Sequence, residues 1–249
     1  MMVNPDKIII NSIVFKKELD QGVSQLDLLK KIAQIGLRCF EVRREFLHNG
    51  EEELKAMKEM ADALKLTLFY SVNEDLLCHH QLNPELEQLL QEAIVLGAPF
   101  IKLNIGDASK VSFHQLEQLR QLMDKTLPIK VENNQDPIGA SLKNCHHFMT
   151  RIKEARLPIS FVFDTANWIF VGESLTEAVS LMKESTDYLH CKNYEMSNHL
   201  PGLSEGLFKG EIKVKHLLSE FTNLSYLALE YPTDTASLLM DIAEITDER

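Results

Sequence analysis

Two hydrophobic patterns alternate along the whole chain. Short apolar runs rich in β-branched and aromatic residues are separated by longer stretches in which apolar residues return every third or fourth position. The first pattern is typical of buried strands and the second of amphipathic helices. Strands are predicted at about 8–15, 39–45, 67–72, 100–106, 128–134, 159–167, 188–194 and 224–232. Helices are predicted at about 23–36, 51–65, 84–97, 113–126, 141–156, 174–186, 212–221 and 235–247.

The residues that flank these stretches support the same division. Ser174 and Glu177 form a Ser-x-x-Glu pattern, which is typical of the first turn of a helix. Gly36 and Gly97 follow two predicted helices, where a left-handed residue commonly ends a helix. Eight strand–helix units with short connections predict an α/β fold whose parallel sheet closes into a (β/α)8 TIM barrel.

A doubly wound open sheet is the competing fold. Such a sheet would carry a glycine-rich phosphate loop after its first strand. The corresponding segment, SIVFKKELDQG, contains neither a GxGxxG nor a Walker pattern. No linker rich in Pro, Gly or Ser interrupts the alternation. We therefore predict one barrel domain over residues 1–249.

Within each predicted strand, apolar and polar residues alternate. In the fourth strand Ile101, Leu103 and Ile105 share one face, whereas Lys102 and Asn104 share the other. The apolar face must pack against the surrounding helices, so the polar face points into the barrel. The upper layer of a barrel interior, at the carboxyl ends of the strands, is where barrel enzymes place their active sites.

Composition narrows the class of protein. Hydrophobic residues make up 45% of the chain, and no apolar run reaches the roughly 18 residues that a membrane span needs. The net charge is −11 without any basic block, which argues against a nucleic-acid partner. Four scattered cysteines without a CxxC pair, and an N-terminus without the features of a signal peptide, are typical of a reduced compartment. We expect a cytoplasmic protein with no nucleic-acid or membrane partner.

Four of the predicted strands end with a residue that binds metals well. These residues are Glu132 in IKVENN, Asp164 in FVFDTAN, His190 in LHCKN and Glu230 in YLALEYP. A hard divalent cation prefers carboxylate oxygens together with at most one imidazole. Buried charges that lack a function are costly, so four of them on inward-facing positions favour a site for one divalent metal ion.

Internal ion pairs are the alternative explanation for these charges. Lys130 lies two residues before Glu132, and Arg43 lies two residues after Glu41. Pairs of this kind would give a polar core without any function. The flanking acid Glu45 is a further candidate partner of Arg43, although a guanidinium there could also bind a substrate carboxylate or phosphate.

At these residues the sequence resembles the sugar isomerase/epimerase superfamily, whose members have a xylose-isomerase-like barrel. The superfamily includes hydroxypyruvate isomerase, ketose 3-epimerases and inosose dehydratases, and more distantly endonuclease-IV-type enzymes. The resemblance covers essentially the whole chain. It rests on Glu41 in CFEVRRE and on the motifs VEN, FDTAN, LHCKN and LEYP.

The resemblance implies a ligand set and a reaction. Glu132, Asp164, His190 and Glu230 would hold one divalent ion, either Mn, Mg, Co or Zn. Glu132 and Glu230 would also exchange protons with a substrate carbon through an enediolate. The expected substrate is a small carbohydrate, and because such barrels are often dimers or tetramers, association of identical chains is left open.

Five further residues are candidates for substrate binding, namely Glu41, Lys102, Asn167, Trp168 and Lys192. Lys192 has the parity to reach a substrate oxygen, and an internal salt bridge is the alternative. Trp168 could form a wall against a sugar ring or fill the core of its own loop. Many relatives carry a histidine where this chain has Asn167, which can hydrogen-bond a hydroxyl or carbonyl group but cannot act as a cation.

Three functions remain open at this point. The first is a metal-dependent isomerase or epimerase. The second is a metal-assisted lyase that removes water from an inositol- or sugar-derived ketone. The third is a barrel that binds a sugar without catalysis. Nuclease activity is not expected, because repair endonucleases need several zinc ions and a surface for DNA. A long connection over residues 193–212 is expected to close over the substrate.

Overall fold

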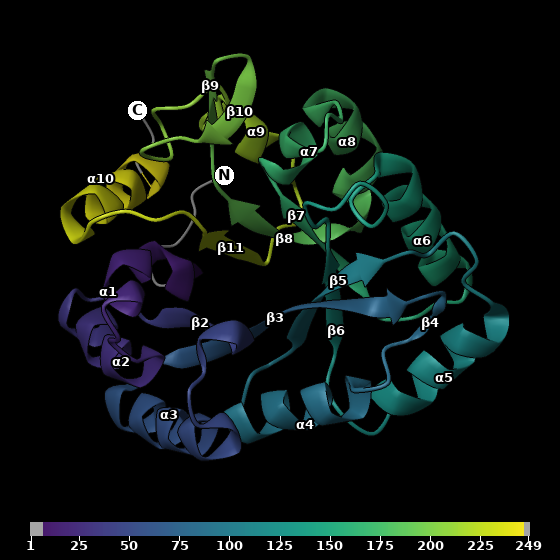
Figure 1. Ribbon diagram of the computed structural model, residues 1–249, viewed down its shortest axis with the longest axis horizontal. Coiled ribbons are helices and arrows are strands. Elements are labelled where there is room, and N and C mark those ends of the chain that lie inside the picture. The colour runs from purple at the N-terminus through teal and green to yellow at the C-terminus, as the bar shows by residue number, and fades with distance from the viewer. Residues whose placement is uncertain (1–6, 247–249) are drawn as a thin grey trace.

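Eight parallel strands form a closed barrel in the computed structural model, which describes residues 7–246 (Figure 1). Each strand pairs with its neighbours in the sequence of units, and the last pairs with the first. The strands are β1 (Ile8–Asn11), β2 (Cys39–Arg43), β3 (Thr67–Cys78), β5 (Ile101–Gly106), β6 (Ile129–Glu132), β7 (Ser160–Asp164), β8 (Thr186–Cys191) and β11 (Tyr226–Leu229). The predicted (β/α)8 barrel is confirmed.

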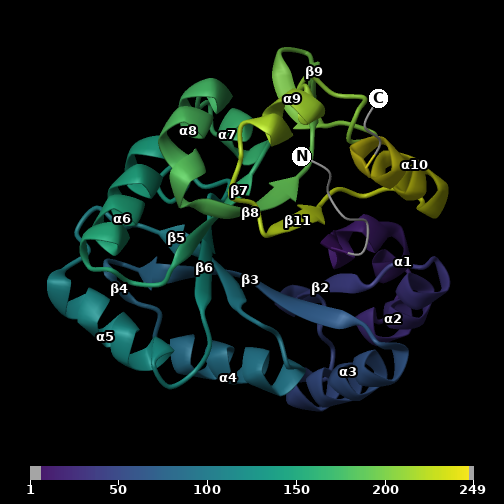
Figure 2. The same ribbon diagram turned by 180° about the vertical axis from the view of Figure 1, so that it is seen from behind.

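A ring of helices surrounds the barrel (Figure 2). Each predicted helical stretch corresponds to one of them: α2 (Gln25–Gln34), α3 (Gly50–Leu64), α4 (Leu86–Leu96), α5 (Phe113–Met123), α6 (Leu142–Glu154), α8 (Leu175–Met182), α9 (Val214–Ser219) and α10 (Thr235–Thr246). Two short helices were not predicted, α1 (Lys16–Asp20) and α7 (Asn167–Phe170). No helix between residues 7 and 246 is long and apolar enough to cross a membrane.

The predicted helix ends agree with the structure. The Ser174 side chain accepts a hydrogen bond from the backbone N–H of Glu177 at the start of α8. Gly97 ends α4 with a φ of 76°, and Gly36 follows α2 with a φ of 84°. Both glycines are therefore left-handed, as the sequence pattern indicates.

The first strand is shorter than predicted. It ends at Asn11, and residues Ser12–Phe15 form a 3-10 turn instead of continuing the strand. The reason is local, because the Asn11 side chain accepts a hydrogen bond from the backbone N–H of Ile13 and so starts the turn. Apolar residues alone could not distinguish this turn from a strand.

The third strand is longer than predicted. It continues past a bulge between Ser71 and Asp75 and turns back into the antiparallel strand β4 (Gln81–Leu82). At the end of β5, Gly106 has a φ of 73°, and a Cβ atom there would lie 2.2 Å from the carbonyl oxygen of Leu77. Only glycine permits this close approach of the β3–β4 hairpin.

The barrel interior has an apolar lower layer beneath a polar upper layer. The lower layer is a separate cluster formed by Ile9, Cys39, Phe69, Phe100, Val162, Tyr188 and Ala228. Tyr188 and Ala228 share the strand face of His190 and Glu230 respectively, one step lower. The residues of opposite parity, such as Leu103, belong to the larger cluster between the barrel and the helices. The predicted strand faces are therefore confirmed.

Candidate metal and active site

Four adjacent strands bring the predicted metal ligands together. Glu132 and Asp164 end β6 and β7, His190 is the next-to-last residue of β8, and Glu230 follows β11. One ligand atom from each residue lies within 4.8 Å of the others, and all four side chains are buried. Parity and strand order thus place three carboxylates and one imidazole at one point of the barrel.

The polar atoms of this cluster fit a cation. Glu132 Oε1, Asp164 Oδ2 and His190 Nδ1 are buried and form no hydrogen bond of good geometry with any residue between 7 and 246. All three nevertheless lie close to a charged group, since His190 Nδ1 is 2.7 Å from Glu132 Oε1 and Asp164 Oδ2 is 2.6 Å from Lys192 Nζ. Buried polar atoms without well-directed hydrogen bonds are costly, and a divalent ion would take all three as ligands. The donor set and its unsatisfied atoms therefore fit one divalent ion.

Three basic side chains surround the carboxylates. The Lys102 ammonium contacts Glu132, and Lys192 Nζ lies 2.6 Å from Asp164 Oδ2 and 3.2 Å from Glu230 Oε2. Arg43 Nη1 lies 2.7 Å from Glu230 Oε1. Internal ion pairs of the kind weighed as an alternative do exist, and one of the suggested pairs, Arg43 with Glu45, is among them.

Two of those suggested pairs are absent from the described ion pairs. Lys130 pairs with Asp187 at 2.6 Å instead of Glu132, and its ammonium lies 4.8 Å from the centre of the Phe100 ring. Arg43 pairs with Glu45 and not with Glu41. Lys130 therefore belongs to the lower layer of the barrel, away from the ligand cluster.

The pKa values of the two glutamates, Glu132 and Glu230, are lowered in this environment. Burial acts to raise the pKa of Glu132, but the charges of Lys102 and His190 outweigh it and lower that pKa to about 2. Burial likewise opposes the shift at Glu230, where Lys192 and His190 hold the pKa well below its ordinary value. Both glutamates are therefore ionised at neutral pH in the metal-free chain.

The pKa values of Asp164 and His190 shift in the opposite direction, upward. Burial raises the pKa of Asp164 to about 7, because it outweighs the attraction of Lys192. Burial lowers the pKa of His190, but Glu41 and Glu132 outweigh it and hold that pKa well above its ordinary value. Opposite shifts within one cluster of carboxylates are typical of functional sites.

Asn167 contributes through its backbone. Its N–H donates to Asp164 Oδ1 at 2.9 Å and so orients the carboxylate. Its side-chain amide is already engaged, because Nδ2 donates to the Asn133 carbonyl at 2.7 Å and Oδ1 accepts from Gln135 Nε2 at 2.9 Å. Asn167 thus lies beside the site, but its side chain points to other protein groups.

Trp168 is not brought to the site. Its indole is fully buried in the cluster between the barrel and the helices, with ring centroids 5.4 Å from Phe163 and 6.2 Å from Phe161. The short helix α7 begins at Asn167 and turns the next side chain outward. The structure therefore corrects the predicted substrate contact of Trp168, which is a core residue.

Several residues of the cluster were missed by the sequence analysis. Asn11 donates to Glu41 Oε1 at 2.5 Å and lies 3.4 Å from Glu230 Oε1. Asn133 exchanges two hydrogen bonds with the backbone of Asp164. Strand parity could have indicated Asn11, which ends β1 two residues after the inward-facing Ile9.

Hydrogen bonds from the Asn193 side chain hold together the two ends of the connection after β8. Asn193 Nδ2 donates to the carbonyls of Leu207 and Ile212, and its Oδ1 accepts from the N–H groups of Tyr194 and Ile212. Between these contacts the chain forms an antiparallel hairpin, β9 (Tyr194–Ser197) and β10 (Leu200–Leu203). Closure of this segment over a substrate stays a prediction.

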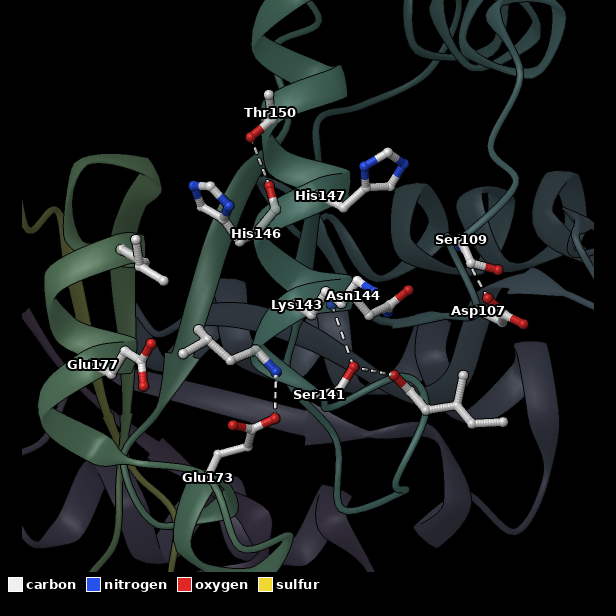
Figure 3. A pocket seen from close by; sticks show the side chains of 13 residues that line it. Asp107, Ser109, Ser141, Lys143, Asn144, His146, His147, Thr150, Glu173 and Glu177 are labelled. Atoms are coloured by element: carbon white, nitrogen blue, oxygen red, sulfur yellow. Dashed lines mark hydrogen bonds between the residues drawn. The ribbon is translucent and has the colours of Figure 1, made fainter.

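A surface pocket of about 970 Å³ lies elsewhere (Figure 3). Its walls come from α6, α8 and the loop after β5, and they include Asp107, His146, His147 and Glu173. None of the four clustered ligands lines it. The candidate metal cluster at the upper end of the barrel is therefore separate from this pocket.

Comparisons with known proteins reveal similarity in structure. No family model and no curated protein sequence matches the chain. Among solved structures, a xylose isomerase domain containing protein from Salmonella typhimurium LT2 matches with a TM-score of 0.68 at 17% identity, covering 99% of this chain and 95% of that one.

Two other solved structures are chemically informative. D-psicose 3-epimerase from Clostridium cellulolyticum H10, solved with D-tagatose, matches with a TM-score of 0.60 at 14% identity, covering 97% of this chain and 93% of that one. The IolI protein, solved with a zinc atom, matches with a TM-score of 0.65 at 13% identity, covering 96% and 94%. The chain therefore has the fold of the xylose isomerase-like TIM barrels.

Proposed function

We propose that the chain is a divalent-metal-dependent isomerase or epimerase of a small sugar or related hydroxy-carbonyl compound. The observation that carries this proposal is the convergence of Glu132, Asp164, His190 and Glu230 within 4.8 Å, buried at the upper end of a barrel. Among proteins of the same fold, one is an epimerase solved with a ketose and another holds zinc.

In this proposal the four residues hold the ion. When bound, the ion would offset the negative charge that develops on substrate oxygens during proton abstraction. Glu132 removes a proton from the carbon next to the carbonyl group, which gives an enediolate. Glu230 takes up a proton from solvent and delivers it to the opposite face, and Glu132 then releases its proton to solvent. The two glutamates come from β6 and the end of β11, so they approach the centre of the barrel from different sides.

The basic residues position the substrate. Lys102 and Lys192 already place their ammonium groups against Glu132 and Glu230, so a substrate oxygen at either carboxylate is within reach of a donor. Asn167 is assigned a different role from the predicted one. Through its backbone N–H it holds Asp164 in place, because its side chain is bonded to other protein groups.

Turnover of ketoses and inososes in deuterated water tests the proposal. An isomerase or epimerase incorporates deuterium at the carbon next to the carbonyl and conserves the number of atoms, whereas a lyase gives a product that has lost water. The Glu132→Gln variant should lose at least about a thousandfold in kcat, because an amide cannot accept the proton.

The matched control is Glu117→Gln, which changes a partly exposed glutamate on α5. Its turnover should equal that of the wild type. Full activity in Glu132→Gln would overturn the assignment of that residue, and sugar binding without any turnover would leave the chain a binding barrel.

A further inference from the structure

Glu41 is a buried carboxylate that lies inside the barrel and has no exposed surface. The Tyr188 hydroxyl and Asn11 Nδ2 donate to its two oxygens, one to each. His190 Nε2 lies 3.2 Å from Oε1 and 3.3 Å from Oε2. Each carboxylate oxygen therefore already has protein partners, which leaves no oxygen of Glu41 for the substrate contact that the sequence suggested.

The two nitrogens of the His190 ring face different groups. Nε2 faces Glu41, whereas Nδ1 faces Glu132 Oε1 at 2.7 Å and Glu230 Oε2 at 3.4 Å. Nδ1 is therefore the nitrogen turned toward the proposed metal ligands Glu132 and Glu230. A nitrogen that binds a cation offers its lone pair, so with an ion bound the ring hydrogen would lie on Nε2, where Glu41 can accept it.

Neighbouring side chains hold both Glu41 and His190 in place. Asn11 Oδ1 accepts from the backbone N–H of Ile13 at 3.0 Å, which fixes the amide with Nδ2 turned to Glu41. The Tyr188 ring stands edge-on to the imidazole, with centroids 4.8 Å apart and an interplanar angle of 87°. The ring of His190 is thus restrained by packing as well as by hydrogen bonding.

We propose that Glu41 is a positioning residue, which holds His190 with hydrogen on Nε2 and turns Nδ1 toward the metal site. This inference rests on the proposed metal site and replaces the substrate-binding role predicted for Glu41. A carboxylate that orients a metal-binding histidine sets both its tautomer and its direction. Asn11 and Tyr188 in turn orient Glu41 through their hydrogen bonds to its carboxylate.

The test combines nuclear magnetic resonance of protein labelled with ¹⁵N-histidine with calorimetric titration of Zn²⁺. In the metal-free wild type we expect a downfield, slowly exchanging Nε2–H proton from His190. In the zinc-bound wild type we expect hydrogen on Nε2 and a metal-shifted Nδ1. In Glu41→Gln we expect this proton to move upfield or disappear, and zinc affinity to fall about 10- to 100-fold.

Two further variants separate positioning from folding. Glu53→Gln changes another buried glutamate, which accepts from the backbone of His48 and Asn49 outside the barrel. This control should keep the His190 signals and zinc affinity of the wild type. Tyr188→Phe keeps the aromatic packing and removes one donor to Glu41, so it should weaken zinc binding less than Glu41→Gln does.

The possible outcomes are distinguishable. If Glu41→Gln keeps both the Nε2–H signal and the zinc affinity of the wild type, the positioning role is wrong. A wild type without the Nε2–H signal also overturns it. A wild type that shows the signal but binds no divalent metal supports the orientation of the ring and overturns the proposed function instead.

Discussion

At the scale of single residues, the barrel interior contains both ion pairs and unsatisfied ligand atoms. The contact of Lys102 with Glu132 and that of Lys192 with Asp164 are what a purely structural polar core would show. These ion pairs neutralise charge but do not explain why three carboxylates and one imidazole each offer a ligand atom within 4.8 Å of the others. This donor set favours a metal site over a structural network.

Outside the barrel interior, one carboxylate makes a pH-dependent contribution to stability. Burial acts to raise the pKa of Glu92, but hydrogen bonds from Arg44, Tyr70 and Gln88 outweigh it and lower that pKa. A lowered pKa in the folded state stabilises the protein above the unfolded-state value, about 4.3. This stabilisation is lost as the pH falls through the lower, folded-state pKa.

Glu92→Gln should therefore reduce the free energy of unfolding by roughly 2 kcal/mol at pH 7, where the charged hydrogen bonds are intact. The difference from the wild type should shrink as the pH falls below about 4. Urea unfolding at a series of pH values measures both quantities. A difference that stays constant from pH 7 to pH 3 would contradict this account.

At the scale of elements, the β3–β4 hairpin depends on one close backbone approach. Gly106 ends β5 against Leu77, and the register places these two residues opposite each other. The strand β3 thereby continues to Cys78, past residue 72, where the predicted strand ends. The bulge between Ser71 and Asp75 allows this extension, because it restores pairing with β5 after the interruption.

Gly106→Ala should destabilise the protein by about 3 kcal/mol, since it combines a positive φ with a steric clash against backbone. Gly22→Ala is the matched control, because Gly22 has a φ of 87° and nothing within 4 Å of its Cβ position. The control should show only the smaller cost of the positive φ, about 1 kcal/mol. Equal losses of unfolding free energy in the two variants would show that the contact with Leu77 does not matter.

At the scale of the whole molecule, much of the fold follows from the sequence. Eight alternating patterns predict the barrel, and parity places Glu132, Asp164, His190 and Glu230 on its inner face. Parity does not extend to Trp168, because α7 begins at Asn167 and a helix rotates successive side chains by a different angle.

The contacts within the site are harder to predict from the sequence than the fold is. The sequence indicates that Glu41 faces inward but not that Asn11, Tyr188 and His190 occupy its oxygens, because these partners come from strands distant in the chain. The β9–β10 hairpin could not be predicted from the sequence for another reason. Its residues pair with each other and are mostly exposed, so they carry no buried alternation.

The central claim is that four buried residues hold one divalent ion, and metal binding tests it most directly. Metal analysis and titration calorimetry with Mn²⁺, Mg²⁺, Co²⁺ and Zn²⁺ compare the wild type with Asp164→Ala/His190→Ala. The control Asp124→Ala/His114→Ala changes the same residue types at exposed positions of α5 and its end.

The account predicts about one equivalent of metal per chain in the wild type and in the control, and none bound tightly in Asp164→Ala/His190→Ala. A wild type that takes up none of the four ions would contradict it. Equal uptake by the wild type and Asp164→Ala/His190→Ala would also contradict it, because the ion would then bind elsewhere.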